Sequence, residues 1–147
     1  MNIVTYNDFF VKLPFAFDSA ELRKATHTVR NLAKALTGKD FNETYTLALN
    51  HKKNGHPWEG QNVRGLYWTR PDDSYEEVTR CEQYDESGFT EFNKAFEHTY
   101  FAEVHKILTG KYKTGRMRLM MLPPRSTISW HRDPEKRIHI PITSNAG

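Results

Sequence analysis

Hydrophobic residues with helical spacing occupy two stretches of the chain. Between residues 22 and 36 apolar side chains recur every three or four positions and charged residues fill the gaps, which predicts a helix with one buried stripe. The stripe consists of Leu22, Ala25, Val29, Leu32, Ala33 and Leu36. Asp18 is expected to cap this helix, Glu21 to complete a capping box, and Gly38 to end it. A second helix is predicted over about residues 90–108, with Gly110 beyond its end.

Strand patterns make up most of the remainder. Residues 44–50 (TYTLALN) and 64–70 (RGLYWTR) are rich in β-branched, aromatic and aliphatic side chains, which predicts two strands. The loop between them, HKKNGHPWEGQNV, either lines a site or is plain surface. From residue 115 the patterns RMRLMML, TISWH and RIHIPI read as strands, separated by the turn sequences PPRS and DPEK. Helices followed by short strands predict an α+β protein with an antiparallel sheet or barrel as its core.

Length and composition predict one soluble domain covering residues 1–147. Hydrophobic residues make up 37% and charged residues 27% of the chain, as in globular proteins. Cys81 is the sole cysteine, so no internal disulfide forms and a reducing compartment is favoured. The chain has no signal-peptide pattern and no apolar run long enough for a bilayer. We therefore expect a cytoplasmic protein with no membrane partner.

Charge is distributed unevenly along the chain. Residues 72–91 carry eight acids and one base, and residues 105–118 carry five bases and no acid. Such blocks are more typical of solvated faces than of nucleic-acid sites. The alternative is a nucleic-acid surface with Tyr112 stacking on a base, which salt would weaken. Its basic residues would be Lys106, Lys111, Lys113, Arg116 and Arg118.

The stretch ISWHRDPEKRIHIPI, residues 128–142, combines several kinds of chemistry. Residues two apart in a strand share a face, so His131 and Asp133 present an imidazole and a carboxylate together, and Trp130 and Arg132 face the other way. Pro134 keeps Asp133 extended and ends the strand. A histidine and a carboxylate supply two of the three protein donors of the non-haem iron(II) oxygenases. His-x-Asp is by itself a weak motif, so an ordinary charged strand remains the alternative.

The next predicted strand alternates polar and apolar residues. Arg137 and His139 take one face, and three isoleucines take the other. An arginine can fork onto a carboxylate with paired hydrogen bonds, which is the chemistry needed to hold a dicarboxylic cosubstrate. Arg137 and His139 are placed to do this.

Residues 122–145, LPPRSTISWHRDPEKRIHIPITSN, resemble a known family. A Pro-rich turn, a strand ending in His-x-Asp and an Arg-x-His-Ile-Pro strand are similar to the aspartyl/asparaginyl β-hydroxylase-like branch of the iron(II)- and 2-oxoglutarate-dependent oxygenases. Small phage and marine-bacterial proteins belong to that branch. The match covers roughly the last 25 to 30 residues, and the order of its motifs is fairly specific.

The resemblance implies both a fold and an activity. The fold would be a double-stranded β-helix (jelly roll, cupin-like) with the N-terminal helices packed on the sheet. His131 and Asp133 match the first two iron ligands, and Arg137 and His139 match a pair near the 2-oxoglutarate carboxylate. The implied reaction couples oxidative decarboxylation of 2-oxoglutarate to hydroxylation of a peptide side chain or a small molecule. The metal ligands would be the only catalytic residues, since the cofactor carries the chemistry.

The chain also departs from the family pattern. Aspartyl hydroxylases lack the carboxylate ligand, so Asp133 indicates another member and an Asp or Asn substrate is not implied. The family has a distal histidine ligand and a basic anchor for 2-oxoglutarate further downstream, whereas this chain ends at Gly147. The other histidines considered do not lie on the expected distal strand; these are His51, His56, His98 and His105.

These departures lead to an expectation and an alternative. We expect an incomplete jelly roll without its C-terminal strands, as in a truncated chain, with little or no turnover. Its open sheet edges could pair two copies into a homodimer. The alternative from another functional class is a non-catalytic jelly-roll binding module, in which the His-x-Asp strand binds no metal.

Overall fold

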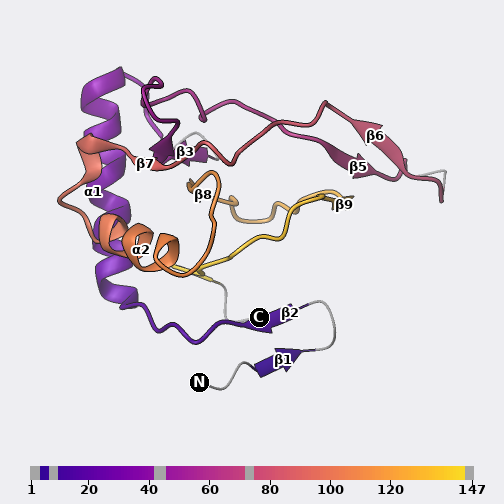
Figure 1. Ribbon diagram of the computed structural model, residues 1–147, viewed down its shortest axis with the longest axis horizontal. Coiled ribbons are helices and arrows are strands. Elements are labelled where there is room, and N and C mark those ends of the chain that lie inside the picture. The colour runs from indigo at the N-terminus through magenta and orange to yellow at the C-terminus, as the bar shows by residue number, and fades with distance from the viewer. Residues whose placement is uncertain (1–3, 7–9, 42–45, 72–74, 145–147) are drawn as a thin grey trace.

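The structure, a computed structural model, describes residues 4–6, 10–41, 46–71 and 75–144. It is an α+β protein in which helices pack on small antiparallel sheets, as the sequence predicts (Figure 1). Its elements are β1 (Val4–Tyr6), β2 (Phe10–Lys12), α1 (Ser19–Thr37), β3 (Thr46–Ala48), β4 (Asn50–His51), β5 (Tyr67–Thr69), β6 (Val78–Arg80), β7 (Glu91–Phe92), the 3₁₀ helix η1 (Lys94–Phe96), α2 (Tyr100–Thr109), β8 (Arg118–Met120) and β9 (His131–Arg132). Within the described ranges, neither α-helix has the length and apolar character that crossing a membrane requires.

Helix α1 begins and ends where the sequence predicts. Asp18 Oδ1 accepts hydrogen bonds from the N–H groups of Ala20 at 2.8 Å and Glu21 at 3.1 Å. Gly38 adopts φ 72°, a left-handed conformation that suits glycine, and its N–H donates to the carbonyl of Lys34. The capping box differs from the prediction, because the N–H of Asp18 donates to the Tyr100 hydroxyl at 3.2 Å. The helix start is therefore tied to α2.

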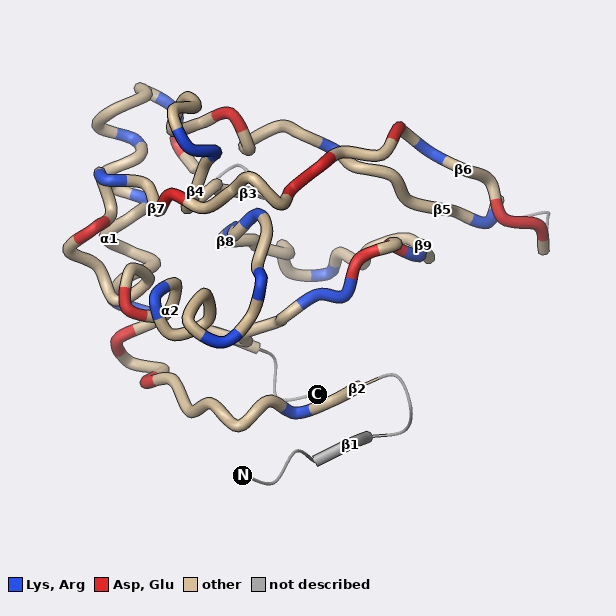
Figure 2. Tube along the Cα trace, in the orientation of Figure 1, with Lys and Arg blue, Asp and Glu red and all other residues tan. Residues whose placement is uncertain are grey.

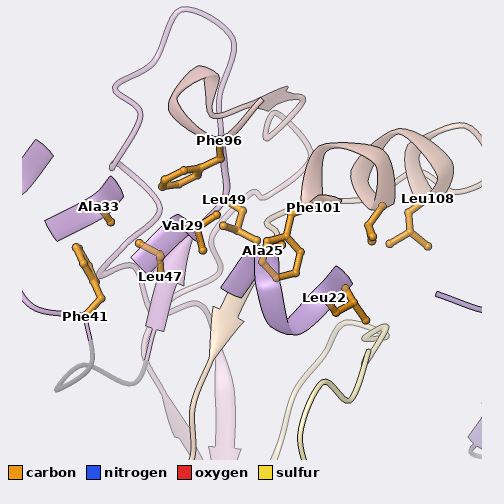
Figure 3. Close-up of a cluster of buried hydrophobic side chains, with 11 residues drawn as sticks. Leu22, Ala25, Val29, Ala33, Phe41, Leu47, Leu49, Phe96, Phe101 and Leu108 are labelled. Carbon is orange, nitrogen blue, oxygen red and sulfur yellow. The ribbon is translucent and has the colours of Figure 1, made fainter. Parts of the chain in front are cut away.

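The buried stripe of α1 is narrower than predicted. Leu22, Ala25, Val29 and Ala33 are buried, whereas Leu32 and Leu36 are 37% and 61% exposed. Figure 3 shows the buried side chains of α1 meeting Leu47 and Leu49 of the β3–β4 segment and aromatic residues from η1 and α2. The core of the protein lies at this junction of helices and sheet.

The second predicted helix is wrong in its first half. Residues 91–92 form strand β7, which pairs with β4, and the 3₁₀ helix η1 follows before α2 begins at Tyr100. The buried side chain of Asn93 explains the break, because its Oδ1 accepts the Ala95 N–H while its backbone N–H donates to the Leu49 carbonyl. Thr99 is extended, with φ −99° and ψ 159°, and therefore separates η1 from α2.

The described strands form four small antiparallel sheets. Strand β3 pairs with β8, and β5 lies between β6 and β9. The β5–β6 ribbon extends away from the helices with β9 alongside it (Figure 1). These pairings confirm strands within 44–50 and 64–70, although residues 44–45 lie outside the described ranges.

The predicted C-terminal strands form only in part. Of TISWH only the last residue enters a ladder, in β9, and residues 137–142 enter none. The strand prediction for RIHIPI is therefore wrong, since an alternating pattern sets faces but does not supply a partner strand. Ile140 and Ile142 still pack against the core, while Ile138 is 41% exposed.

Candidate metal and anion site

Strand β9 places the His-x-Asp sequence against β5. His131 lies opposite Thr69 and Arg132 opposite Trp68. The Arg132 guanidinium lies 4.0 Å from the centroid of the Trp68 ring and forms an ion pair with Glu77 at 2.6 Å. Arg132 is therefore held on the tryptophan face of the sheet, and His131 is free to face the other side.

His131 and Asp133 face each other. Nε2 of His131 lies 3.6 Å from Oδ2 of Asp133, which is longer than a hydrogen bond. The side chain of Asp133 is 18% exposed and that of His131 is 35% exposed, so both donors remain accessible at the edge of the fold. The predicted meeting of the imidazole and the carboxylate is present in the structure.

A backbone contact sets the tautomer of His131. Nδ1 lies 2.8 Å from the Ser129 carbonyl oxygen, and this oxygen can only accept a hydrogen bond. Nδ1 therefore carries the hydrogen in the neutral ring, and Nε2 keeps a free lone pair directed toward Asp133. In metal sites, a carbonyl that accepts the hydrogen of the other ring nitrogen typically orients the binding histidine.

Arg137 contacts the same carboxylate oxygen. Its Nε lies 3.0 Å from Oδ2 of Asp133. The structure thus joins three of the four predicted residues, although Arg137 contacts the predicted metal ligand instead of standing free for a cosubstrate. His139 is exposed and forms no hydrogen bond or ion pair with any residue in the described parts of the chain.

Arg118 on β8 is a further member of this site. It is half-buried, and burial lowers its pKa to about 10, with further lowering by the nearby charges of Arg116 and Arg137. Asp133 and Glu86 act in the opposite direction on the same pKa. Its guanidinium has no hydrogen bond or ion pair to the residues that the structure describes. A half-buried guanidinium that no hydrogen bond or ion pair holds in the described chain can donate to an anion.

The basic segment that includes Arg118 is not uniformly exposed. The side chain of Arg116 is 3% exposed, pairs with Glu86 at 2.7 Å and donates to the carbonyls of Gly60 and Val63. Tyr112 packs edge-on against Phe15. Arg116 is thus committed to the fold and unavailable to phosphates, although Figure 2 shows a run of basic residues between α2 and β8.

A third protein donor does not join His131 and Asp133 in the described chain. Among residues 4–6, 10–41, 46–71 and 75–144, no group of three or more His, Cys, Asp or Glu side chains is placed to hold a metal ion. His105 packs on Phe92 with ring centroids 5.2 Å apart, and burial lowers its pKa. His51 bonds through Nδ1 to the Lys52 carbonyl. Both therefore have roles outside this site.

Comparison of the chain with family models, with curated proteins and with solved structures gives no match.

Proposed function

We propose that this protein is an iron(II)- and 2-oxoglutarate-dependent dioxygenase that hydroxylates a peptide side chain or a small molecule in the cytoplasm. The observation that carries the proposal is the approach of His131 Nε2 to Asp133 Oδ2 at 3.6 Å while Nδ1 of the same ring is held by the Ser129 carbonyl. The proposed jelly-roll fold is supported by the β3–β8 and β5–β9 pairings, which join strands far apart in the sequence.

The two donors suit a metal ion in type. Two adjacent ligand atoms on one metal at about 2.1 Å lie about 3.0 Å apart when the bonds are perpendicular. His131 Nε2 and Asp133 Oδ2 lie 3.6 Å apart, so the two side chains would have to approach each other by about 0.6 Å to hold a metal on adjacent positions. An imidazole nitrogen and a carboxylate oxygen suit iron(II), and two protein donors leave positions for a chelating cosubstrate.

The arginines give the site its affinity for a dicarboxylate. Bound iron(II) supplies the activation of dioxygen and the oxidation of 2-oxoglutarate. Asp133 Oδ2 is in contact with Arg137, so if Asp133 held a metal through this oxygen, the Arg137 guanidinium would lose part of its ion pair. Its N–H donors would then be available to a carboxylate, and those of Arg118 have no partner in the described chain even without a metal. This shift reconciles the observed contact of Arg137 with its predicted role.

Anaerobic titration of the protein with iron(II), with and without 2-oxoglutarate, tests the proposal. A chelated complex gives a weak visible charge-transfer band, which we expect only when both ligands are present. His131→Gln and Asp133→Asn should each remove the band or raise the metal Kd by more than the roughly 10- to 100-fold that loss of an outer-shell partner costs.

The matched control is His98→Gln, which removes a histidine whose side chain is 95% exposed. This variant should bind iron(II) like the parent protein. Equal weakening by His98→Gln and His131→Gln would mean that the metal binds surface histidines, and the proposal would then be abandoned. Absence of the band in the parent protein would have the same consequence.

A non-catalytic binding module is the second candidate, and the Asp133–Arg137 ion pair favours it. In that case Asp133 serves to fix Arg137. Asp133→Asn would then reduce the stability of the protein without any metal-dependent signal to lose. Equal denaturation midpoints for the Asp133→Asn variant and the parent, together with a lost charge-transfer band, support the oxygenase.

A further inference from the structure

A cleft of about 420 Å³ lies beside the candidate metal site, where β5 meets the approach to β9. Its volume falls in the range of small-molecule sites, which is about 300–1,000 Å³. Its lining comes from the end of β5, the end of β6 and the residues just before β9, and consists of Thr69, Arg70, Pro71, Arg80, Ser129 and Trp130. The cleft therefore joins two guanidiniums, two hydroxyls and an apolar wall.

Arg70 is held in place by an aromatic contact. Its guanidinium carbon lies 4.4 Å from the centroid of the Trp130 ring. A guanidinium stacked on an indole keeps its N–H groups at the rim of its plane, where they can still donate. Arg70 makes no hydrogen bond or ion pair with the residues in the described ranges, so these donors are open to a ligand.

Arg80 enters the cleft from β6. Its Nε lies 3.1 Å from Thr69 Oγ1, which anchors the side chain and leaves its two terminal nitrogens without a hydrogen-bond partner among the described residues. A guanidinium anchored through Nε presents its terminal nitrogens as a fork, which matches a carboxylate or a phosphate.

None of the described residues that line the cleft is acidic, and Asp72 and Asp73, which follow Pro71 in the sequence, lie outside the described residues. The pKa of Glu77 is lowered mainly by its hydrogen bond from Arg132 and to a smaller extent by the charge of Arg70. Both carboxylate oxygens of Glu77 accept hydrogen bonds from Arg132, at 3.1 and 2.6 Å. The described lining thus combines two arginines without a neutralising carboxylate.

Trp130 gives the cleft its apolar side. This indole is 47% exposed and stands with Pro71 in the lining. We propose that the cleft binds an organic oxyanion, with Arg70 and Arg80 on its carboxylate or phosphate and Trp130 and Pro71 against its apolar or aromatic part.

We assign the ligand of the cleft as the substrate of the proposed enzyme because the cleft adjoins the strand that carries His131. Thr69 lies opposite His131 in the β5–β9 ladder, and Trp130 directly precedes that histidine. Trp130 faces the side of the strand opposite to His131, so a molecule anchored in the cleft lies at the end of the strand that carries His131. The assignment as substrate rests on the proposed oxygenase function, whereas binding of the anion does not.

Isothermal titration of the metal-free full chain at low salt tests the cleft with phenyl phosphate, benzoate and neutral benzamide. We expect saturable binding of phenyl phosphate or benzoate, at least about tenfold tighter than that of benzamide and weakened by added salt. The stronger of the two anions identifies the group that the arginines select. If neither anion binds more tightly than benzamide, the proposal fails.

Matched variants separate this cleft from general charge. Arg70→Gln and Arg80→Gln should each weaken binding about tenfold or more, while Arg23→Gln, on the exposed face of α1, should leave it unchanged. Equal effects of all three substitutions would reduce the binding to net charge and overturn the proposal. Trp130→Leu removes the ring that holds Arg70 as well as the apolar wall, so it should weaken binding of phenyl phosphate more than that of inorganic phosphate. Equal weakening of both would exclude an apolar contact between the ligand and the indole.

Failure of the cleft and failure of the metal site give different results. Arg80→Gln should retain the iron(II) and 2-oxoglutarate charge-transfer band, and His131→Gln should retain anion binding. Anion binding without any metal complex in the parent protein would remove the oxygenase and leave the cleft. A metal complex without anion binding would refute the cleft and leave the proposed oxygenase.

Discussion

Asn50 joins three separated parts of the chain, and its replacement tests how the fold holds β8 in place. The side chain is fully buried. Nδ2 donates to the carbonyls of Phe89 at 2.8 Å and Gly115 at 3.0 Å, and Oδ1 accepts the Met117 N–H at 2.7 Å. Two of these contacts lie immediately before β8, the strand that carries Arg118.

The structure gives the expected size of the effect. Each hydrogen bond contributes about 1 kcal/mol net, so Asn50→Ala should lower the free energy of unfolding by about 3 kcal/mol. That is a large fraction of the roughly 5–15 kcal/mol by which small domains are stable. Asn50→Asp keeps the acceptor for Met117 but places a carboxylate oxygen against two carbonyls. Its destabilisation should therefore be larger at neutral pH and shrink in acid, where the protonated carboxyl can donate.

Urea denaturation followed by tryptophan fluorescence measures both variants against the parent protein at each pH. The control is Asn62→Ala, which removes an exposed amide and should change stability by less than about 0.5 kcal/mol. The dependence of the unfolding free energy on urea should stay the same, because the unfolded state exposes similar surface. A loss below about 1 kcal/mol for Asn50→Ala, at an unchanged slope, would refute the assignment of Asn50 as a structural tie.

Two further predictions concern the helices. Asp18→Ala removes the N-cap of α1 and should cost about 1 kcal/mol in urea denaturation, with Ser19→Ala as the neutral comparison; equal losses would contradict the capping role. The buried Nε2 of His105 has no hydrogen-bond partner among the described residues, and burial lowers its pKa, an effect that the charge of Glu91 partly offsets. The unfolded state then takes up a proton that the folded state refuses, so stability should fall as pH drops below the unfolded value of about 6.5. His105→Phe should reduce this loss between pH 7.5 and 5.5, and an unchanged pH dependence would exclude His105 as its source.

The helix predictions succeed where local chemistry decides and fail where tertiary contacts decide. The ends of α1 follow from Asp18 and Gly38, whose conformations depend on their own backbone. Residues 91–96 have a helical apolar pattern, yet β4 offers a strand partner and the Leu49 carbonyl draws the Asn93 N–H out of helical geometry. No pattern within 90–108 indicates that partner, because it lies about forty positions away.

The strand predictions divide in the same way. Alternation of side chains identifies β5 and β8, but a ladder also requires a neighbour that no local pattern specifies. Residues 137–142 keep part of their alternation, with Ile140 and Ile142 on the core and Arg137 exposed, without joining a ladder in the described chain. The sequence thus predicts which side of this segment faces inward better than it predicts hydrogen bonding.

The sequence could predict that His131 and Asp133 face each other, because this depends on a two-residue period within one segment. The sequence could not predict the contribution of Arg118 to the site, because that depends on where β8 lies relative to Arg137 and Asp133. The pair Arg116-x-Arg118 is visible in the sequence, but it has the same appearance as an exposed nucleic-acid patch. Only burial distinguishes Arg116, paired with Glu86, from Arg118, which has no such partner among the described residues.

The charges of the site determine whether a metal ion and a dicarboxylate favour each other's binding. Arg116 and Arg137 are each matched by an acid, Glu86 and Asp133, which leaves the charge of Arg118 in excess. A divalent cation bound at His131 and Asp133 adds two positive charges to that excess, so metal alone is disfavoured. A dicarboxylate offsets two of these three positive charges, and each ligand should therefore raise the affinity for the other. For the proposed pair of ligands, we therefore expect 2-oxoglutarate to tighten iron(II) binding through the charge of Arg118 as well as through chelation.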